Sequence, residues 1–436
     1  MSLKASLKKL IPKQVFDGIE PYGHLIESAL INTINGFPAR GLKVIGITGT
    51  NGKTSTSYMV HRMLHEAGYK VGLMTTVGYG IGNNIKPQIH HMTNVSVPEL
   101  MQRLKWMQSE GVEWLVLETT SHALAQNRVF GVPYSVAVLT NVTHEHLDYH
   151  RTFERYRDAK RKLFKLANNN KHGLQLGIIN AEDPSAKFFK SDIKNPLTYG
   201  IAAGDVRAIN VQLAASGVDY EVTIKDTQYH IHCNIPGSFN VFNSLAAVCV
   251  GQQLGLTKLQ IEQGIAALPS VEGRMTRIDE GQNFDIIVDF AHTPDSFEKL
   301  FKDLRPVVKG KLIAMFGSAG RRDEAKRAVQ GQLAGQYCDE VVVTEEDDRD
   351  IDGLAIMDQI AAGAEKAGKR RDKNLFLVHD RTEAITFALR RATEGDTVIL
   401  LGKGHEKTIE RANGENPWDE LKTVKVAIKQ YLELNV

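Results

Sequence analysis

The chain has 436 residues, too many for one ordinary hydrophobic core, so two or three domains are expected. Its 53 Lys and Arg residues nearly balance its 51 Asp and Glu residues, and no overall field points to nucleic acid or an anionic membrane as a partner. Three widely spaced cysteines argue against a zinc ribbon or a disulfide framework, and no apolar stretch approaches the length of a membrane span. We therefore expect a cytoplasmic protein with buried thiols.

Residues 1–42 are expected to form a short helical lead, too small for a core of its own. Apolar runs then alternate with helical patterns to about residue 200, which predicts a parallel sheet with helices on both faces. The strands expected in this block are 44–47, 71–74, 114–117, 136–139 and 177–179. Residues 205–236 alternate apolar and polar side chains, which predicts a small antiparallel insert, and two helices should follow between residues 240 and 268.

A second alternating block begins after Gly273 and Arg274. Its expected strands are 286–288, 312–316, 341–343, 375–378 and 398–401. Thr293 and Pro294 predict a helix start, because a capping residue is followed by proline at the first helical position. The fold class expected is α/β, with a lead, a central domain with a phosphate loop and a Rossmann-like C-terminal domain at 1–42, 43–270 and 271–436.

A glycine-rich stretch follows the first expected strand and precedes a helical pattern: Gly49-Thr50-Asn51-Gly52-Lys53-Thr54-Ser55. Glycines let backbone N–H groups turn inward on a phosphate, and the helix start adds positive charge. Lys53 would reach the β- and γ-phosphate oxygens, and Thr54 would give its hydroxyl to Mg²⁺. Ile47 stands where the strict pattern G-x-x-x-x-G-K-[ST] needs glycine, so an ordinary turn with a solvated lysine is the alternative. The flanking strand and helix favour a nucleotide site.

Glu118 ends the strand expected at 114–117, where a parallel sheet would deliver it beside the phosphate loop. Taken alone, a glutamate at a strand end is usually a solvated loop residue. The polar segment 119–122 that follows it would need partners if it were buried. A carboxylate beside Thr54 is the kind of ligand that Mg²⁺ requires.

The segment after the strand expected at 136–139 is rich in histidine. If it were extended, four residues would share one face and could bind zinc: His144, His146, Asp148 and His150. A plain surface loop is a second interpretation. In the third, one or two of these residues serve a magnesium-nucleotide site, although imidazole is a less usual ligand for a hard cation.

Two polar loops follow strands of the second block. Residues 344–350 are dense in acid and are equally typical of a solvated turn. Residues 402–406 follow the last expected strand, and a glycine-rich loop at that place indicates a ligand site.

Together these segments resemble the Mur ligases, the ATP-dependent ligases that build the peptidoglycan stem peptide, and within them the MurE type, the UDP-N-acetylmuramyl-tripeptide synthetases. The resemblance covers about residues 43–425. It rests on ordered motifs at residues 49–54, 118–128, 140–150, 156–160, 237–243, 273–275, 289–295 and 402–406.

The resemblance implies a two-step acyl transfer. ATP converts a carboxylate to an acyl phosphate, and an incoming amine then displaces phosphate to form an amide. By carry-over the catalytic residues are Lys53, Glu118, His146 and Lys160. Thr54 and Glu118 would bind one Mg²⁺, and His146 would help to hold a second. Lys160 matches the family's carbamylated lysine, although its basic helix would by itself indicate solvated surface.

The resemblance also implies the binding residues. Beside the loop 49–55, the nucleotide would contact Asn243, Arg274, Asp289 and His292. The nucleotide-sugar peptide would lie near Thr93, Ser121, Gln126 and Arg128. The incoming amino acid would lie near Arg322, Asp347, Arg349, Gly402 and Glu406.

The chain departs from the MurE pattern at three places. Diaminopimelate-adding members have Asp-Asn-Pro-Arg where this chain has residues 346–349, Glu-Asp-Asp-Arg, so the arginine is kept and the stiffening proline is absent. Arg349 favours an amino acid with an extra carboxylate over lysine, because a guanidinium repels ammonium. Thr93 and Asn94 stand where a Thr-Thr pair is usual. Only about 42 residues precede the loop strand, which we interpret as a remnant of the family's UDP-binding domain.

The function expected is a monomeric ligase that adds a diamino acid, meso-diaminopimelate, to UDP-MurNAc-L-Ala-D-Glu, with ATP and two Mg²⁺ ions as cofactors. One alternative is a Mur-like or folylpolyglutamate-synthase-like ligase that acts on an acceptor without UDP. Another is a nucleotide-dependent switch or scaffold. Against a GTPase switch stands the absence of an Asn-Lys-x-Asp tetrapeptide, and against a scaffold stands the joint presence of Lys53, Glu118, His146 and Lys160.

Overall fold

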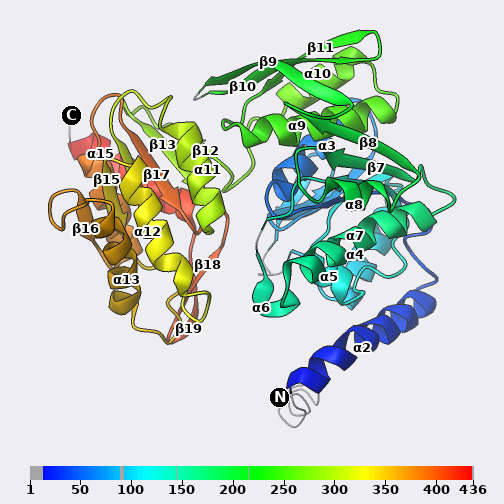
Figure 1. The fold of residues 1–436 in the computed structure, drawn as a ribbon, viewed down its shortest axis with the longest axis horizontal. Coiled ribbons are helices and arrows are strands. Elements are labelled where there is room, and N and C mark those ends of the chain that lie inside the picture. The colour runs from blue at the N-terminus through cyan, green and yellow to red at the C-terminus, as the bar shows by residue number, and fades with distance from the viewer. Residues whose placement is uncertain (1–12, 89–92, 144, 215, 435–436) are drawn as a thin grey trace. The chain divides into compact units, whose positions relative to one another are not determined.

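The structure is a computed structural model that describes residues 13–88, 93–143, 145–214 and 216–434. The chain divides into two compact units (Figure 1). The first comprises the described residues up to Val211 together with Tyr220–His232 and Val241–Leu268. The second comprises Gln212–Asp219, Cys233–Asn240 and the described residues from Pro269 onward.

An 11-stranded sheet runs through the first unit in the order β11-β10-β9-β8-β7-β6-β1-β5-β2-β3-β4. Neighbouring strands from β2 across to β9 pair in parallel, whereas β3 and β4 form an antiparallel edge. The strands are β1 (Lys43–Thr48), β2 (Val71–Met74), β3 (Gly78–Ile81), β4 (Asn84–Pro87), β5 (Trp114–Glu118), β6 (Tyr134–Leu139), β7 (Leu176–Asn180), β8 (Asn195–Gly200), β9 (Val206–Ala214), β10 (Gly217–Ile224) and β11 (Thr227–Cys233).

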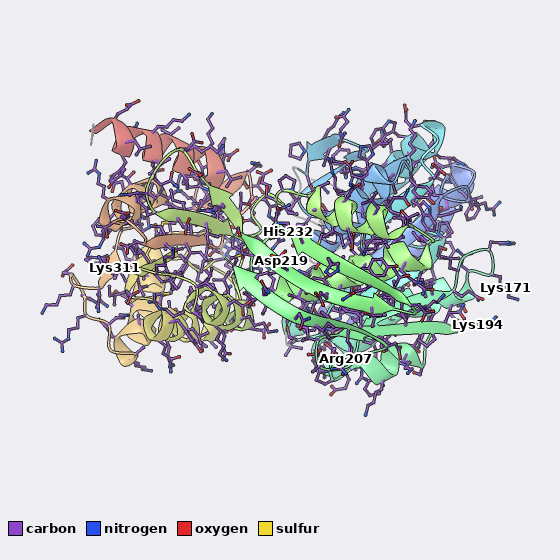
Figure 2. All side chains as sticks on the ribbon, turned by 90° about the horizontal axis from the view of Figure 1, so that it is seen from above. Lys171, Lys194, Arg207, Asp219, His232 and Lys311 are labelled. Atoms are coloured by element: carbon purple, nitrogen blue, oxygen red, sulfur yellow. The ribbon has the colours of Figure 1, made fainter. Side chains whose placement is uncertain are left out.

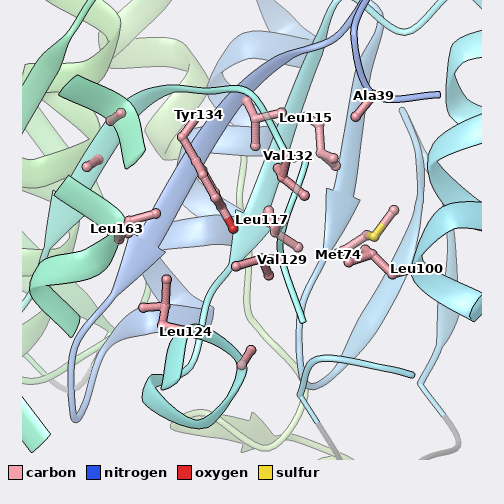
Figure 3. Close-up of a cluster of buried hydrophobic side chains, with 14 of the residues drawn as sticks. Ala39, Met74, Leu100, Leu115, Leu117, Leu124, Val129, Val132, Tyr134 and Leu163 are labelled. Atoms are coloured by element: carbon pink, nitrogen blue, oxygen red, sulfur yellow. The ribbon is translucent and has the colours of Figure 1, made fainter. Parts of the chain in front are cut away.

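Helices cover the sheet of the first unit. They are α2 (Lys13–Ile34), α3 (Lys53–Glu66), α4 (Val97–Ser109), α5 (Ser121–Ala125), α6 (Leu147–His150), α7 (Phe153–Asn169), α8 (Ala186–Lys190), α9 (Phe239–Gln253) and α10 (Lys258–Ala266). One hydrophobic cluster gathers residues of β1, β5 and β6 with residues of α4, α5 and α7 (Figure 3). Leu115 and Leu117 of β5 belong to it, and Val116 between them is buried outside it, as a strand covered on both faces requires.

The second unit has a six-stranded sheet in the order β12-β13-β17-β14-β15-β16, in which β12 is antiparallel to β13 and the other pairs are parallel. Its strands, with the separate hairpin β18–β19, are β12 (Thr276–Ile278), β13 (Asp285–Asp289), β14 (Leu312–Phe316), β15 (Glu340–Val343), β16 (Leu375–Leu377), β17 (Thr397–Leu401), β18 (Thr408–Arg411) and β19 (Gly414–Pro417). Its helices are α11 (Pro294–Leu304), α12 (Ala325–Tyr337), α13 (Gly353–Lys366), α14 (Arg381–Arg391) and α15 (Glu420–Leu434).

The α/β fold class is confirmed, and all ten strands expected from apolar runs are present. The helix start at Thr293 is also confirmed, since this residue caps α11 with a full capping box. The segment expected as an insert contains β9, β10 and β11, which extend the central sheet beyond β8 instead of forming a sheet of their own. The sequence analysis missed two hairpins, β3–β4 at the edge of the central sheet and the separate pair β18–β19.

Charged side chains project from the surface of both units, as Figure 2 shows for Lys171, Lys194 and Lys311. Among the described residues, no helix combines the length and the apolar character needed to cross a lipid bilayer.

A buried cation joins the carboxyl ends of two strands in the second unit. Arg381, the first residue of α14, is fully buried. Its Nη1 donates to the carbonyl of Glu345 at 3.0 Å, and its Nη2 donates to the carbonyl of Leu401 at 2.9 Å. Both terminal carboxylate oxygens of Glu420 accept from this guanidinium, the shortest contact being 2.6 Å. The loops that follow β15 and β17 are thereby held at a fixed separation.

We predict that Arg381→Met lowers the free energy of unfolding of the second unit by about 3–5 kcal/mol, because it leaves the Glu420 carboxylate buried without its cation. Urea unfolding followed by tryptophan fluorescence measures this change. The double variant Arg381→Met/Glu420→Met should recover most of the loss. A single variant as stable as the wild type would contradict the role given to this pair.

Candidate active site

Three loops meet at one edge of the central sheet because β1 lies between β5 and β6. In this parallel arrangement Ile47 is level with Glu118, and Thr48 is level with Leu139. The loop after β1, the carboxylate that ends β5 and the segment after β6 therefore leave the sheet side by side. Such an edge is where parallel sheets hold their ligands.

Two loop positions leave no space for a side chain. Gly52 has a φ of 84°, and a Cβ there would lie 2.3 Å from Oδ1 of Asn243. A Cβ on Gly49 would lie 1.8 Å from Oγ1 of Thr140. The glycines thus let Asn243 and Thr140 pack directly against the loop backbone. The predicted nucleotide residue Asn243 is brought to the loop, where its buried Oδ1 accepts from Thr56 at 3.3 Å.

The loop is held by the segment that follows β6. The backbone N–H of Thr50 donates to the carbonyl of Asn141 at 2.8 Å, and the N–H of Asn51 donates to Oδ1 of Asn141 at 2.9 Å. The Thr50 hydroxyl accepts from the N–H of Thr143 at 2.9 Å and lies 3.0 Å from the hydroxyl of Tyr156. These contacts fix the loop shape before any ligand binds.

The predicted magnesium residues of the loop and of β5 are in contact. Thr54 Oγ1 donates to Oε2 of Glu118 at 2.9 Å, and both residues are buried. The same carboxylate accepts from the N–H and the hydroxyl of Thr76, each at 3.1 Å, and Oγ1 of Thr76 lies 2.8 Å from Oγ1 of Thr93, from which it can accept. The hydroxyl and the carboxylate supply the hard oxygen ligands that suit Mg²⁺.

Two further loop residues lie at the start of α3. Lys53 Nζ donates to the carbonyl of Thr50 at 2.7 Å, so the ammonium stays over the loop instead of extending into solvent. Ser55 is buried in the first helical turn.

Lys160 lies beneath the phosphate loop and not on the surface. It is 1% exposed, and its Nζ donates to the carbonyl of Gly49 at 2.6 Å. Burial, followed by the charge of Lys53, lowers the pKa of Lys160 well below its ordinary value, while Glu145 and Glu118 act in the opposite direction. The solvated-surface interpretation of this lysine is wrong, because α7 packs its face against the loop. The lowered pKa favours the neutral amine.

The histidine-rich segment is not extended. Residues Leu147–His150 form a helical turn, and His146 precedes it with a φ of 55°. The zinc interpretation requires alternate residues to share one face. In this helical turn they do not. Within the described part of the chain, no group of three His, Cys, Asp or Glu residues could hold a metal ion, and His144 lies outside the described residues.

Rings of α5 and of the segment around α6 pack together beside the phosphate loop. The ring of His122 lies 4.7 Å from that of His146, 4.5 Å from that of Tyr149 and 5.3 Å from that of His150. Burial, with smaller contributions from His146 and His150, lowers the pKa of His122 to about 3. His122 is therefore neutral at physiological pH, and His146 keeps a half-exposed side chain, 44% accessible, at the edge of the cluster.

Asn94 connects the predicted acceptor residues to Glu118, the predicted metal ligand. Its side chain donates to the carbonyl of Glu118 at 2.8 Å and accepts from both the N–H and the hydroxyl of Thr120. Its own carbonyl accepts from Nη1 of Arg128 at 2.8 Å. The sequence analysis noted Asn94 only as a departure from a Thr-Thr pair and missed this role.

The other two predicted acceptor residues belong to α5. Ser121 is buried at its first position, and Oγ of Ser121 lies 3.0 Å from Nε2 of His150. Gln126 is the C-cap residue of this helix and is partly exposed. All four predicted acceptor residues thus lie in the first unit, at the edge of the sheet that carries Glu118.

In the second unit, three predicted nucleotide residues gather around Phe290. The carboxylate of Asp289, at the end of β13, accepts from the N–H groups of Met275 and Ala291, each at 2.7 Å, and burial raises its pKa. The guanidinium of Arg274 lies 4.6 Å from the centre of the Phe290 ring, and the ring of His292 lies 4.7 Å from it.

The two polar loops of the second unit meet at a buried lysine. Lys403 is fully buried, and its Nζ contacts Oδ1 of Asp347 at 2.8 Å and Oε2 of Glu406 at 2.7 Å. Gly402 has a φ of 101°, and a Cβ there would lie 2.5 Å from Oε2 of Glu346. The solvated-turn interpretation of residues 344–350 is therefore wrong, because the first five residues of this segment, 344–348, are buried.

The turn at residues 346–349, which lacks the proline of the Asp-Asn-Pro-Arg pattern, is held by Asp348. Its carboxylate accepts from the N–H of Glu346 at 3.4 Å and lies 3.3 Å from Nε2 of His379. Arg349 follows with a φ of 58° and joins the network through Glu410, a residue of the hairpin that the sequence analysis missed. Arg322 is exposed and takes no part in these contacts.

Comparisons with known proteins cover both units. Residues 47–251 match the model of the Mur ligase middle domain, and residues 273–404 match that of the Mur ligase, glutamate ligase domain. A UDP-N-acetylmuramyl-tripeptide synthetase of Roseiflexus sp. is 40% identical over 422 residues, which span 94% of this chain and 83% of that protein.

Two other similar proteins are named for diaminopimelate. A UDP-N-acetylmuramoyl-L-alanyl-D-glutamate–2,6-diaminopimelate ligase of Geobacillus thermodenitrificans is 37% identical, over 92% of this chain and 82% of the relative. A solved structure of a ligase with the same name superposes with a TM-score of 0.66 and 27% identity, over 95% of this chain and 83% of that chain.

The burial of Lys160 predicts a pH dependence of stability. Because its pKa is lower in the folded chain than its unfolded value of about 10.4, the unfolded chain binds more protons between the two values. The free energy of unfolding should therefore rise with pH toward about 10 in the wild type, relative to Lys160→Met. Urea unfolding across this range, in bicarbonate-free buffer, measures the difference. Lys165→Met, an exposed position on the same helix, is the control. A pH-independent difference for Lys160→Met would contradict the assignment.

Proposed function

The chain is a member of the Mur ligase family, and we propose that it adds meso-diaminopimelate to UDP-MurNAc-L-Ala-D-Glu at the expense of ATP. The observation that carries the proposal is the contact of Thr54 with Glu118 at a phosphate loop whose underside is held by Lys160. A binding protein would need the loop alone. The carboxylate and the buried amine beside it are groups that phosphoryl and acyl transfer require.

The proposed nucleotide site uses the residues of the loop. The backbone N–H groups at the start of α3 and the ammonium of Lys53 would bind the β- and γ-phosphates, with Asn243 nearby for the base. Thr54 and Glu118 would hold Mg²⁺, because their buried oxygens are 2.9 Å apart and hard. An ion bound there supplies positive charge that neutralises the transferring phosphoryl group. His146 and a carbamylated Lys160 are proposed to support a second ion.

The proposed reaction needs only ATP, the acceptor and the incoming amino acid as reactants. A carboxylate oxygen of the acceptor attacks the γ-phosphorus of ATP, the bond to the β-phosphate oxygen breaks, and ADP leaves. The amine of the incoming amino acid then attacks the carbonyl carbon of the acyl phosphate. Phosphate leaves with the oxygen that came from the acceptor, and the amine loses a proton. The residues proposed to hold the acceptor are Thr93, Ser121, Gln126 and Arg128.

The proposed amino-acid site lies in the second unit around Asp347, Gly402 and Glu406. Arg349 is the reason to propose diaminopimelate over lysine, because its guanidinium pairs with an additional carboxylate and repels an ammonium. Arg322 is proposed to reach the site from an exposed position. From the second unit, Arg274, Asp289 and His292 are proposed to contact the nucleotide. The enzyme is proposed to act as a monomer in the cytoplasm.

A turnover screen tests the proposal. Phosphate release from ATP is followed with meso-diaminopimelate, lysine or alanine, in the presence of UDP-MurNAc-L-Ala-D-Glu or of the same muramyl dipeptide without UDP. The proposal predicts release that depends on both diaminopimelate and the UDP-linked acceptor. Release with only the UDP-free acceptor would select the alternative ligase. Nucleotide binding without amino-acid-dependent release would favour a switch or scaffold.

The role of Lys160 is tested by truncation and rescue. Lys160→Ala should lower kcat by about 10²- to 10³-fold, because the site loses the carbamate that would support the second ion. Short carboxylic acids such as formate or acetate should restore part of the rate by filling the space. Lys165→Ala, on the exposed side of the same helix, should leave the rate unchanged. Unchanged turnover in Lys160→Ala would contradict the carbamate role.

A further inference from the structure

The hairpin β18–β19 is attached to the acidic loop after β15 by two ion pairs from neighbouring residues. Glu410 pairs with Arg349, and Arg411 pairs with Glu345 through contacts of 2.6 and 2.8 Å. At the tip of the hairpin, Arg411 pairs with Gly414. Both ion pairs hold the hairpin on the loop, but only Glu410 contacts Arg349. Variants of the two pairs can therefore separate the effect of hairpin docking from the effect of contact with Arg349.

Glu410 contacts Arg349 through its backbone and its side chain. The carbonyl of Glu410 accepts from the N–H of Arg349 at 3.0 Å, and Oε2 of Glu410 accepts from Nε of Arg349 at 2.6 Å. On the other side, Nη1 of Arg349 donates to the carbonyl of Gly320. The N–H of Glu410 also donates to Oδ1 of Asp347 at 2.9 Å. The guanidinium is consequently fixed between two backbone segments.

This arrangement leaves part of the guanidinium available. A guanidinium has five N–H donors, and the contacts with Glu410 and Gly320 use Nε and Nη1. Among the described residues, Nη2 of Arg349 donates no hydrogen bond. The Arg349 side chain is 17% exposed and that of Glu410 is 40% exposed, so the pair lies at the surface of the proposed amino-acid site. The outer Nη edge retains the geometry that pairs with a carboxylate.

Without Glu410, the guanidinium would have a competing acid close by. Burial raises the pKa of the Asp347 carboxyl, but Lys403, the N–H of Glu410 and the charge of Arg349 together hold it below its ordinary value. Arginine has many rotamers, and an unrestrained guanidinium would lose more freedom when it binds a ligand. By holding Nε, Glu410 keeps the guanidinium away from Asp347 and restricts its rotamers before a ligand binds.

We propose that Glu410 is a positioning residue that presents Arg349 to the side-chain carboxylate of the incoming diamino acid and so sets the preference for diaminopimelate over lysine. The proposal rests on the proposed function and deepens it. It assigns specificity to a residue of the hairpin, 61 positions away from Arg349 in sequence.

Steady-state kinetics of Glu410→Gln and Glu410→Ala test the proposal. Both should raise KM for meso-diaminopimelate by about 10-fold or more, leave kcat within about 2-fold and leave KM for ATP unchanged. The ratio of kcat/KM for diaminopimelate to that for lysine should fall by about 10-fold. Glu410→Asp should restore part of the ratio, since it keeps the charge.

Arg411→Met is the matched control, because it removes the other ion pair of the hairpin without touching Arg349. It should keep the wild-type preference for diaminopimelate. Equal losses of preference in Arg411→Met and Glu410→Gln would show that hairpin docking alone matters and would overturn the proposal. A wild-type preference retained in both Glu410 variants would overturn it too. A wild type that does not prefer diaminopimelate over lysine would instead contradict the proposed amino acid, and the role of Glu410 with it.

Discussion

The position of β1 between β5 and β6 is the constraint on which the candidate site depends. Parallel pairing aligns the carboxyl ends of these three strands, so the phosphate loop, Glu118 and the segment after β6 leave the sheet at one edge. The loop needs no ligand to acquire its shape, because Asn141 and Thr143 bind its backbone and the hydroxyl of Thr50. Preorganisation of this kind is what phosphoryl transfer demands, since catalysis there consists largely of positioning and of electrostatic stabilisation.

Buried basic side chains hold loops in both units. Lys160 donates to the backbone of the phosphate loop, Lys403 joins the two polar loops of the second unit, and Arg381 fixes the strand ends beneath them. Arg381 and Lys403 are each paired with carboxylates, which offsets the cost of burial. Lys160 differs, since it donates to a carbonyl and its pKa is strongly lowered. A paired cation is suited to a structural role and a neutral buried amine to a chemical one.

The sequence predicted the strands well because they are buried on both faces and read as continuous apolar runs. The contact of Thr54 with Glu118 was predictable because the carboxyl ends of neighbouring parallel strands converge at one edge of the sheet. The burial of Lys160 was not, because its local sequence is basic and only the packing of α7 against the loop excludes water. The role of Glu410 depends on a hairpin whose one local signal, Asn413 followed by Gly414, was overlooked. Contacts over such a sequence distance follow from the topology and not from any local pattern.

An isotope experiment can follow one acceptor oxygen through the proposed reaction. UDP-MurNAc-L-Ala-D-Glu labelled with ¹⁸O in the reacting carboxylate is incubated with ATP, meso-diaminopimelate and the enzyme, and the released phosphate is analysed by mass spectrometry. An acyl-phosphate route predicts that each phosphate carries one ¹⁸O from the acceptor, in step with amide formation. Phosphate without the label, released at the rate of ADP formation, would mean that water is the nucleophile and would contradict the assignment of this chain as an amide-forming ligase.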